Sequence, residues 1–479
     1  MEFDGIFYAY YAPKSSSQAK YTSQRLAAFA EQRAQLNRQA KTGQGIDAEL
    51  LERTDSCQTA RLGSAAALGR PENQRRGSGR NGGSMDTARL GTSSSSGSSS
   101  TATSEHAHHA LLSSPFELRH GRRYLREVPY PLPCDLPEIQ RQNLRTLLGC
   151  KIFGRPVCAP KVAKDLPKKV LELGCGSGYW STMCHEYLCS LGQKDTSFTG
   201  LDLAPLAPDH SKQGLNWKFV QHDLRRHTLP FEDGEFDLVM LKDLSLVLQL
   251  GHPFEKFLDE SMRVLGEGGS LEIWESDHVM RALLPHPPPP PSKQKADHEF
   301  AKQTGTFLIS PGTPFAPVQN KYLSQANNWI QEALDRRKLP PLPCSRIAQV
   351  LYQEPELLGD VGIRRVAVPL GELRWERDAT NVRNDSPKTP QKGKAKASGD
   401  VASLTEEQYA IRQTALMTVL QKIESLEPLL KEVSGKNTEE WSHWWASMMS
   451  NLLDPSRGAL SGECLEVGAW WATKLAGDN

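Results

Sequence analysis

The chain has 479 residues, and its 57 basic and 56 acidic side chains nearly cancel, so its charge does not favour nucleic acid as a substrate. No apolar stretch approaches the length of a membrane helix, and the N-terminus does not resemble a signal peptide. The nine cysteines include no C-x-x-C pair, so we expect no metal site and no disulfide framework. These features favour a reducing compartment, the cytoplasm or the nucleus or both.

Residues 1–115 are predicted to be a disordered, low-complexity region. They contain an Arg/Gln/Ala-rich stretch, a glycine- and arginine-rich run, and a Ser/Thr/Gly tract from Thr92 to Ser104. Such segments bury too little apolar surface to offset the entropy of the chain. We therefore expect a single folded domain over residues 116–479.

A helix is predicted just ahead of the first buried strand. Asp135 has the side chain of an N-cap, Pro137 suits the first turn, and Glu138 occupies the N3 position. This helix is expected to end at Leu148.

The run from Val170 to Gly178 is the most informative stretch of the chain. Four residues typical of a buried strand lead into Gly174-Cys175-Gly176-Ser177-Gly178, and a helix-compatible segment follows to about Leu191. Glycine lets a ligand approach the backbone, and the free N–H groups of the following helix can bind a polar group. Dinucleotide folds place the third glycine one residue later, so this spacing does not favour them.

Further strands are predicted after the glycine loop, at Phe198–Leu203, Trp217–Leu224, Phe236–Lys242 and Ser270–Glu275, with a helix from Pro253 to Leu265. Strands that alternate with helices and are almost continuously apolar indicate an α/β fold whose parallel sheet is covered on both faces. Ligands bind at the carboxyl ends of such strands, where Asp202 and Asp223 are expected.

From about Phe116 to Glu275 the chain resembles the fungal class I S-adenosylmethionine-dependent methyltransferases that include the LaeA-like regulators of secondary metabolism. The resemblance rests on Glu-x-Gly-x-Gly-x-Gly, on Gly121-Arg122-Arg123-Tyr124, and on Tyr130-Pro131-Leu132-Pro133. It implies the Rossmann-like class I methyltransferase fold, a mostly parallel sheet with helices on both faces, and S-adenosyl-L-methionine as cofactor.

The resemblance also implies a set of cofactor-binding residues. By analogy, the methionine part of the cofactor is lined by Glu172, Gly174, Gly176 and Gly178. Asp202 is expected to bind the ribose hydroxyls, with Leu203 beside the adenine. Asp223 and Leu224 would frame the adenine edge, and Lys242 would form part of the floor. Cys175 lies within the same loop and is included among the expected cofactor-binding residues, with its thiol interpreted as a small filling group and not as a nucleophile.

The remainder of the domain is predicted to be split by loops. Its core spans residues 167–284, with insertions at about 285–297, which holds five consecutive prolines, and at 378–403, which is rich in lysine. Ile363–Pro369 is predicted to be a further strand, and the capping box Thr405-Glu-Glu-Gln408 is predicted to begin a helix. Residues 404–479 are expected to add helices and the last strands. A stripe formed by Trp441, Trp444, Trp445, Met448 and Leu452 indicates core packing.

The implied reaction is direct methyl transfer, in which an oxygen or nitrogen acceptor needs a base to remove its proton. Weak candidates for that base are Asp243, after the fourth strand, and Asp277 and His278, after the fifth. The fourth strand lacks the Asn-Pro-Pro-Tyr and Pro-Cys sequences, which argues against adenine-N6, glutamine-N5 and cytosine-C5 methylation.

Three functional hypotheses follow from the sequence. The first is a methyltransferase that acts on a small-molecule or protein acceptor. The second is a non-catalytic or weakly catalytic cofactor-binding regulator that acts through protein partners reached by the disordered arms. The third, a nucleotide-dependent oxidoreductase, is disfavoured by the position of the third glycine. We also expect that residues 1–115 can be deleted without loss of cofactor affinity.

Overall fold

The computed structural model describes residues 111–226, 228–249, 252–285, 287, 294–378, 404–454 and 460–476. Of residues 1–115, which are predicted to be disordered, residues 1–110 lie outside the described part of the chain, as do most of the two predicted insertions. Among the described helices, none combines the length and apolar character needed to span a membrane.

Five parallel strands form the centre of the fold. In space they follow the order β7-β6-β3-β4-β5, so the strand order reverses beside β3. This arrangement confirms the predicted α/β fold with a mostly parallel central sheet. The strands are β3 (Lys169–Leu173), β4 (Ser197–Asp202), β5 (Asn216–Gln221), β6 (Phe236–Lys242) and β7 (Leu265–Ser276).

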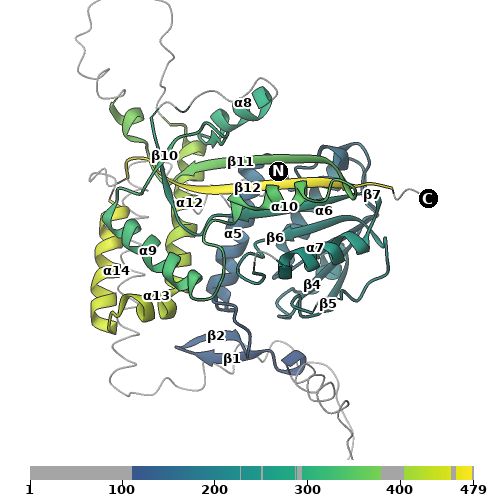
Figure 1. The fold of residues 1–479 in the computed structure, drawn as a ribbon, viewed down its shortest axis with the longest axis horizontal. Helices are drawn as coiled ribbons and strands as arrows, with labels where there is room; N and C mark the ends of the chain where they lie inside the picture. The colour runs from purple at the N-terminus through teal and green to yellow at the C-terminus, as the bar shows by residue number, and fades with distance from the viewer. Residues whose placement is uncertain are drawn as a thin grey trace, which may run out of the picture. The chain divides into compact units, whose positions relative to one another are not determined.

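Antiparallel strands extend the sheet on the β7 side. The C-terminal strand β12 (Glu463–Lys474) pairs with β7 on one edge and with β11 (Leu358–Pro369) on the other. Figure 1 shows β12, in yellow, lying beside β11. Three short strands complete this part of the sheet, and a separate hairpin precedes it: β8 (Arg281–Leu283), β9 (Phe307–Leu308), β10 (Phe315–Ala316), and the hairpin β1 (Phe116–Arg119) and β2 (Arg122–Leu125).

Both faces of the central sheet are buried, because successive residues of a strand point to opposite sides. Leu238 and Met240 of β6 join one apolar cluster, whereas Val239 and Leu241 join the other. The first cluster is covered by α5 (Leu136–Phe153), α6 (Tyr179–Ser190) and α12 (Glu406–Ser425), and the second by α7 (His252–Val264) and α10 (Ile347–Tyr352).

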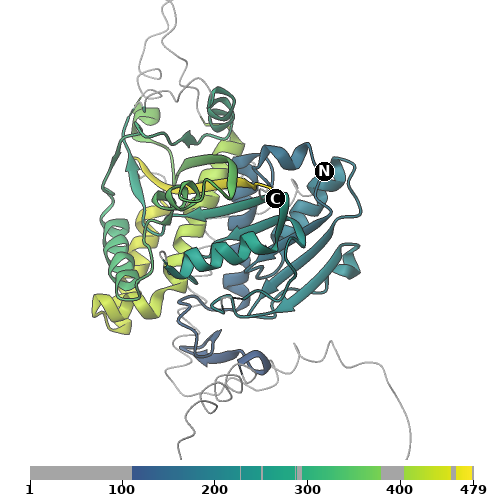
Figure 2. The same cartoon turned by 45° about the vertical axis from the view of Figure 1, so that its right-hand side comes forward.

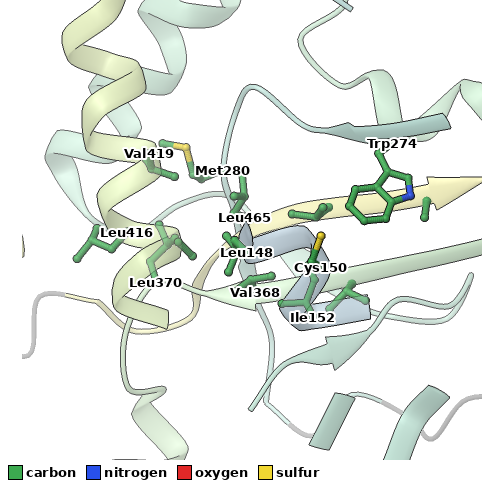
Figure 3. Close-up of a cluster of buried hydrophobic side chains, with 14 of the residues drawn as sticks. Leu148, Cys150, Ile152, Trp274, Met280, Val368, Leu370, Leu416, Val419 and Leu465 are labelled. Atoms are coloured by element: carbon green, nitrogen blue, oxygen red, sulfur yellow. The ribbon is translucent and has the colours of Figure 1, made fainter. Parts of the chain in front are cut away.

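Helix α5 begins where the sequence predicts and continues further. Asp135 caps it by accepting a hydrogen bond from the N–H of Glu138. The helix runs to Phe153, five residues beyond the predicted end at Leu148, because Cys150, Ile152 and Phe153 are buried in the first cluster. Figure 3 shows Leu148, Cys150 and Ile152 in the same cluster of buried side chains as Trp274 of β7.

The remaining helices bring residues from the C-terminal half to the first face of the sheet. The predicted cap at Thr405 is present at the start of α12, and the tryptophan stripe of α14 is packed in the core as expected. The C-terminal helices lie together beside the sheet (Figures 1 and 2). The other helical segments are α8 (Lys295–Gln303), α9 (Lys321–Asp335), α13 (Glu427–Ser434), α14 (Thr438–Leu452), and the 3-10 turns Pro160–Ala163, His210–Gln213 and Pro343–Ser345.

Helix α12 is fixed by a buried arginine. The Arg412 guanidinium donates to the carbonyl oxygens of Gly305 and Gly371 and forms a two-point ion pair with Glu376, at 2.7 and 2.9 Å. A buried ion pair stabilises a fold only while both partners are present, because a lone buried charge is costly.

We expect Glu376→Ala to lower the free energy of unfolding by about 3 kcal/mol, since it leaves the Arg412 charge without its counter-ion. Glu432→Ala is the matched control, because Glu432 is exposed and pairs only loosely with Arg336 and Arg337. Urea titration measures both variants, and equal effects would contradict a structural role for the Arg412 ion pair.

Candidate functional site

A pocket of about 1080 Å³, which includes its solvent-filled mouth, lies at the carboxyl ends of the parallel strands. It lies beside the end of β3, which has β4 as its neighbour on one side and β6 on the other. Open α/β sheets bind ligands at such a reversal of strand order. Its walls come from the loops after the strands, from α5 and α12, and from the segment between residues 125 and 134.

The glycine loop after β3 supplies one wall of this pocket. Gly174 and Gly176 line it, and both have left-handed backbone conformations, with φ of 67° and 53°. A side chain on Gly174 would start 2.5 Å from Leu244, so packing demands glycine there. At Gly176 a Cβ would approach only the Gln142 side chain, at 3.4 Å, so the loop leaves its backbone open toward the pocket.

Three other residues of the predicted loop site do not line the pocket. A Cβ on Gly178 would lie 2.8 Å from the His210 ring, so this glycine serves the packing behind the loop. Glu172 is buried and accepts hydrogen bonds from the N–H and Oγ of Ser181 in the first turn of α6. Cys175 is also buried, and burial raises the pKa of its thiol well above the usual value. That shift disfavours a nucleophilic thiolate at neutral pH, in line with its interpretation as a filling residue.

Asp202 connects the end of β4 to the glycine loop. Its Oδ2 accepts a hydrogen bond of 2.8 Å from the N–H of Gly176, and its Oδ1 accepts one of 2.9 Å from the N–H of Ala204. A carboxylate has about four acceptor positions, so Asp202 can also accept from hydroxyl groups of a ligand. Burial raises the pKa of Asp202, while the backbone N–H groups oppose this effect.

Asp223 and Leu224 lie on the pocket wall two and three residues beyond β5. The Asp223 carboxylate pairs with Arg225, whose Nη2 lies 2.6 Å from Oδ2. From the sequence, Asp223 is expected to frame the adenine, and in the structure the Arg225 guanidinium lies beside that carboxylate. Leu203 and Leu224 line the pocket together with Val128 and Leu206, which gives it an apolar side.

The segment ahead of α5 closes this apolar side. Tyr130, Leu132 and Cys134 of that segment line the pocket, and Leu111 packs in a small cluster with Leu203 and Ala204. The Gln221 amide donates to the carbonyl oxygens of both Leu112 and Leu203, at 2.9 and 3.0 Å. Sequence reasoning used the Tyr-Pro-Leu-Pro element only as a family signature, and its place in the pocket wall was missed.

The opposite end of the pocket is charged. Lys242 and Asp243 follow β6, and the Asp243 carboxylate contacts both Lys242 and Arg145 of α5. Burial disfavours ionisation of Asp243, but these two cations outweigh it and lower its pKa to about 2. A carboxylate this strongly stabilised is a poor proton acceptor at neutral pH, so Asp243 does not fit the role of general base.

His278 and Lys422 face each other at this charged end, and both line the pocket. The Lys422 Nζ contacts His278 Nδ1, and His278 Nε2 lies 2.8 Å from Ser245 Oγ. Burial, followed by the positive charge of Lys422, lowers the pKa of His278 well below its usual value. Lys422 was missed by sequence reasoning because no motif links a lysine of α12 to strand ends more than 140 residues earlier.

Asp277 points away from the pocket. Its carboxylate accepts a hydrogen bond from the N–H of Cys344, and it lies near Glu466 in a buried cluster. Arg281 and Arg365 both pair with Glu466, so guanidinium groups already balance the charge of this cluster. Of the three base candidates named from the sequence, His278 and Asp243 therefore reach the pocket, whereas Asp277 does not.

We expect buried Glu172 to make the stability of the protein depend on pH. Burial raises its folded-state pKa from 4.5 to about 7, so folding favours the protonated form. The stabilising contribution is complete below about pH 4.5 and is lost as the pH rises through about 7. Glu172→Gln should therefore reduce the fall in unfolding free energy between these pH values.

The control for this measurement is Glu356→Gln, which alters an exposed carboxylate that does not line the pocket. Urea titrations at several pH values provide the unfolding free energies. An unchanged pH profile in Glu172→Gln would refute the assignment.

Residues 170–269 match the family model described as a methyltransferase domain. Among curated proteins, none matches the chain. Solved structures that resemble it include the PH0226 protein of Pyrococcus horikoshii OT3, at 23% identity over 27% of this chain and 54% of that chain, with a TM-score of 0.22.

Two further solved structures are similar to parts of the chain. One is a chain from the complex of the Trm112 methyltransferase activator and a methyltransferase of Haloferax volcanii, at 20% identity over 29% of this chain and 55% of that chain, with a TM-score of 0.22. The other is the phosphoethanolamine N-methyltransferase 2 of Haemonchus contortus, at 11% identity over 71% and 59%, with a TM-score of 0.31. The chain thus spans little more than half the length of these three proteins. The segment that is similar to a methyltransferase domain, residues 170–269, carries the glycine loop and the carboxyl ends of β3, β4, β5 and β6.

Proposed function

We propose that the protein is an S-adenosylmethionine-dependent methyltransferase that acts by direct displacement on a small-molecule or protein acceptor. The observation that carries this proposal is the open backbone of Gly176, held by the carboxylate of Asp202 at the switch point of the sheet. The match of residues 170–269 to a methyltransferase domain supports it.

The chemistry of the pocket walls fits this cofactor. Gly174 and Gly176 would accommodate the methionine part, and the free acceptor positions of Asp202 suit ribose hydroxyls. Leu203 and Leu224 offer apolar surface for the adenine. At the charged end, Arg145 and Lys242 supply cations that suit a carboxylate, although both also contact Asp243.

The contribution of the protein to the reaction would be alignment and exclusion of water. S-adenosylmethionine supplies a methyl group already activated by its positive sulfur. Tyr130 and Leu132 cover one side of the pocket, and α5 and α12 border the other. A site enclosed in this way orders the acceptor and limits competing water.

The first test is calorimetric titration of the purified protein with S-adenosylmethionine and S-adenosylhomocysteine. We expect micromolar binding of both, and Gly176→Arg should weaken it by at least about a hundredfold, because its side chain would fill the cradle. Gly192→Arg is the matched control, since Gly192 also has positive φ and has open space around it outside the pocket.

A folded protein that binds neither ligand would contradict the proposed function. Binding without detectable methyl transfer to any acceptor would instead favour the regulator hypothesis, in which a LaeA-like protein acts through partners. Preference for NADH over both ligands would revive the oxidoreductase hypothesis.

The extent of the N-terminal segment needed for binding gives a second prediction. Deletion of residues 1–105 should leave cofactor affinity unchanged. Deletion of residues 1–115 removes Leu111, which packs with the pocket-lining residues Leu203 and Ala204, and the Leu112 carbonyl that accepts from Gln221. Loss of that hydrogen bond and contact should weaken binding about fivefold or more. This revises the expectation that a cut at 115 is harmless, and equal affinities for the two deletions would restore it.

A further inference from the structure

We infer that Lys422 is the base that accepts the proton of the methyl acceptor, with His278 and Ser245 as the residues that position it. The inference rests on the proposed function and extends it to an amino acid far outside the segment similar to a methyltransferase domain. It also narrows the substrate to acceptors whose reacting oxygen or nitrogen carries a proton.

The position of Lys422 supports this role. It projects from α12 into the pocket, is 7% exposed, and shares the charged end with Asp243, Glu275 and His278. Its Nζ contacts His278 Nδ1, and the other ring nitrogen contacts Ser245 Oγ at 2.8 Å. The N–H of Ser245 in turn donates to Glu275 Oε2 at 3.0 Å, so the chain of contacts is anchored in β7.

The charged groups around Lys422 keep it from acting as an ordinary ion-pair partner. In the described part of the chain, no carboxylate lies within ion-pair distance of its Nζ, whereas Arg141 and Arg145 of α5 face the same pocket. Arg141 is paired with Glu138, which also accepts a hydrogen bond from Ser425, and Arg145 is paired with Asp243. The nearby acids are therefore engaged by arginines.

Burial and the two arginines lower the pKa of Lys422 to about 7, while the more distant Glu275 and Asp243 partly oppose them. At neutral pH a large share of the molecules then carries a free lone pair on Nζ. A base with a pKa near the working pH is the most effective at removing a proton. Asp243, with its pKa of about 2, lacks this property.

Methyl transfer is coupled to deprotonation of the acceptor. The acceptor atom forms a bond to the methyl carbon while the carbon–sulfur bond breaks and leaves its electron pair on the sulfur. The acceptor's proton moves to the lone pair of Lys422 Nζ, which becomes an ammonium group. His278, neutral because of its own low pKa, accepts a hydrogen bond from Nζ at Nδ1 and holds the amine in place, and the proton gained by Nζ leaves to solvent at the mouth of the pocket.

The test uses two ligands that differ by one methyl group and one positive charge. A charged Lys422 near the reacting centre should repel S-adenosylmethionine but not S-adenosylhomocysteine. We therefore measure the ratio of the two dissociation constants by calorimetry from about pH 6 to about pH 8.5, on both sides of the pKa of Lys422. As the pH rises, the ratio should shift about tenfold in favour of S-adenosylmethionine.

Four variants of the full chain identify the group whose titration changes the ratio of the two dissociation constants. Lys422→Met should abolish the shift and keep the ratio at its high-pH value, whereas Lys422→Arg should hold it at the low-pH value throughout. Glu275→Gln tests the carboxylate whose pKa burial raises to about 7. It should preserve the shift with its midpoint at lower pH, because the Glu275 charge raises the pKa of Lys422. His278→Asn should move the midpoint of the shift, which a merely structural role would not do.

A constant ratio in the wild-type protein, or the same shift in Lys422→Met, would overturn the assignment of Lys422 while the proposed function stands. Failure of both ligands to bind would overturn the proposed function itself. Folding of each variant is checked by thermal unfolding, and nuclear magnetic resonance of ¹³C-labelled lysine measures the pKa of Lys422 independently. A normal lysine pKa would also contradict the inference.

Discussion

The hydrogen bond between Asp202 and the backbone of Gly176 is the interaction on which the site depends. It joins the loop after β3 to the end of β4, and the same carboxylate also turns the chain at Ala204. Because the loop then has a defined backbone course with positive φ at three glycines, the pocket has a wall that no side chain fills. The reversal of strand order beside β3 opens the sheet at this point.

The second constraint is the cost of burying charge. The pocket brings together Arg141, Arg145, Asp243 and Lys422, each largely removed from water, and a buried charge without a partner is expensive. Arginines take the available acids, since their planar groups form two-point contacts with carboxylates. Lys422 contacts the neutral imidazole of His278 instead of a carboxylate, and burial of its amine therefore lowers its pKa. The free-energy cost of burying charge therefore accounts both for the arginine–carboxylate pairs and for the lowered pKa of Lys422.

The sequence predicted the secondary structure of the core well. Strand β6 has the predicted bounds, and the cap at Thr405 and the burial of the tryptophan stripe were also foreseen. Such features depend on neighbours within one or two turns or on alternation along one strand. Helix α5 was predicted too short, because the burial of its last turn beneath β7 is a long-range contact. The extension of β11 to Leu358 likewise follows from pairing with β12 more than a hundred residues away.

The sequence by itself determined the fold class and the candidate wall of glycines and strand-end acids, because spacing within one βαβ unit limits where those groups can lie. Only the tertiary structure decided which residues face the pocket. In the folded protein Glu172 contacts α6, Asp277 lies in a cluster whose charge arginines balance, and Lys422 contacts His278. These outcomes depend on how α5 and α12 pack across the first face of the sheet. Packing between segments hundreds of residues apart leaves no periodic signal in the sequence.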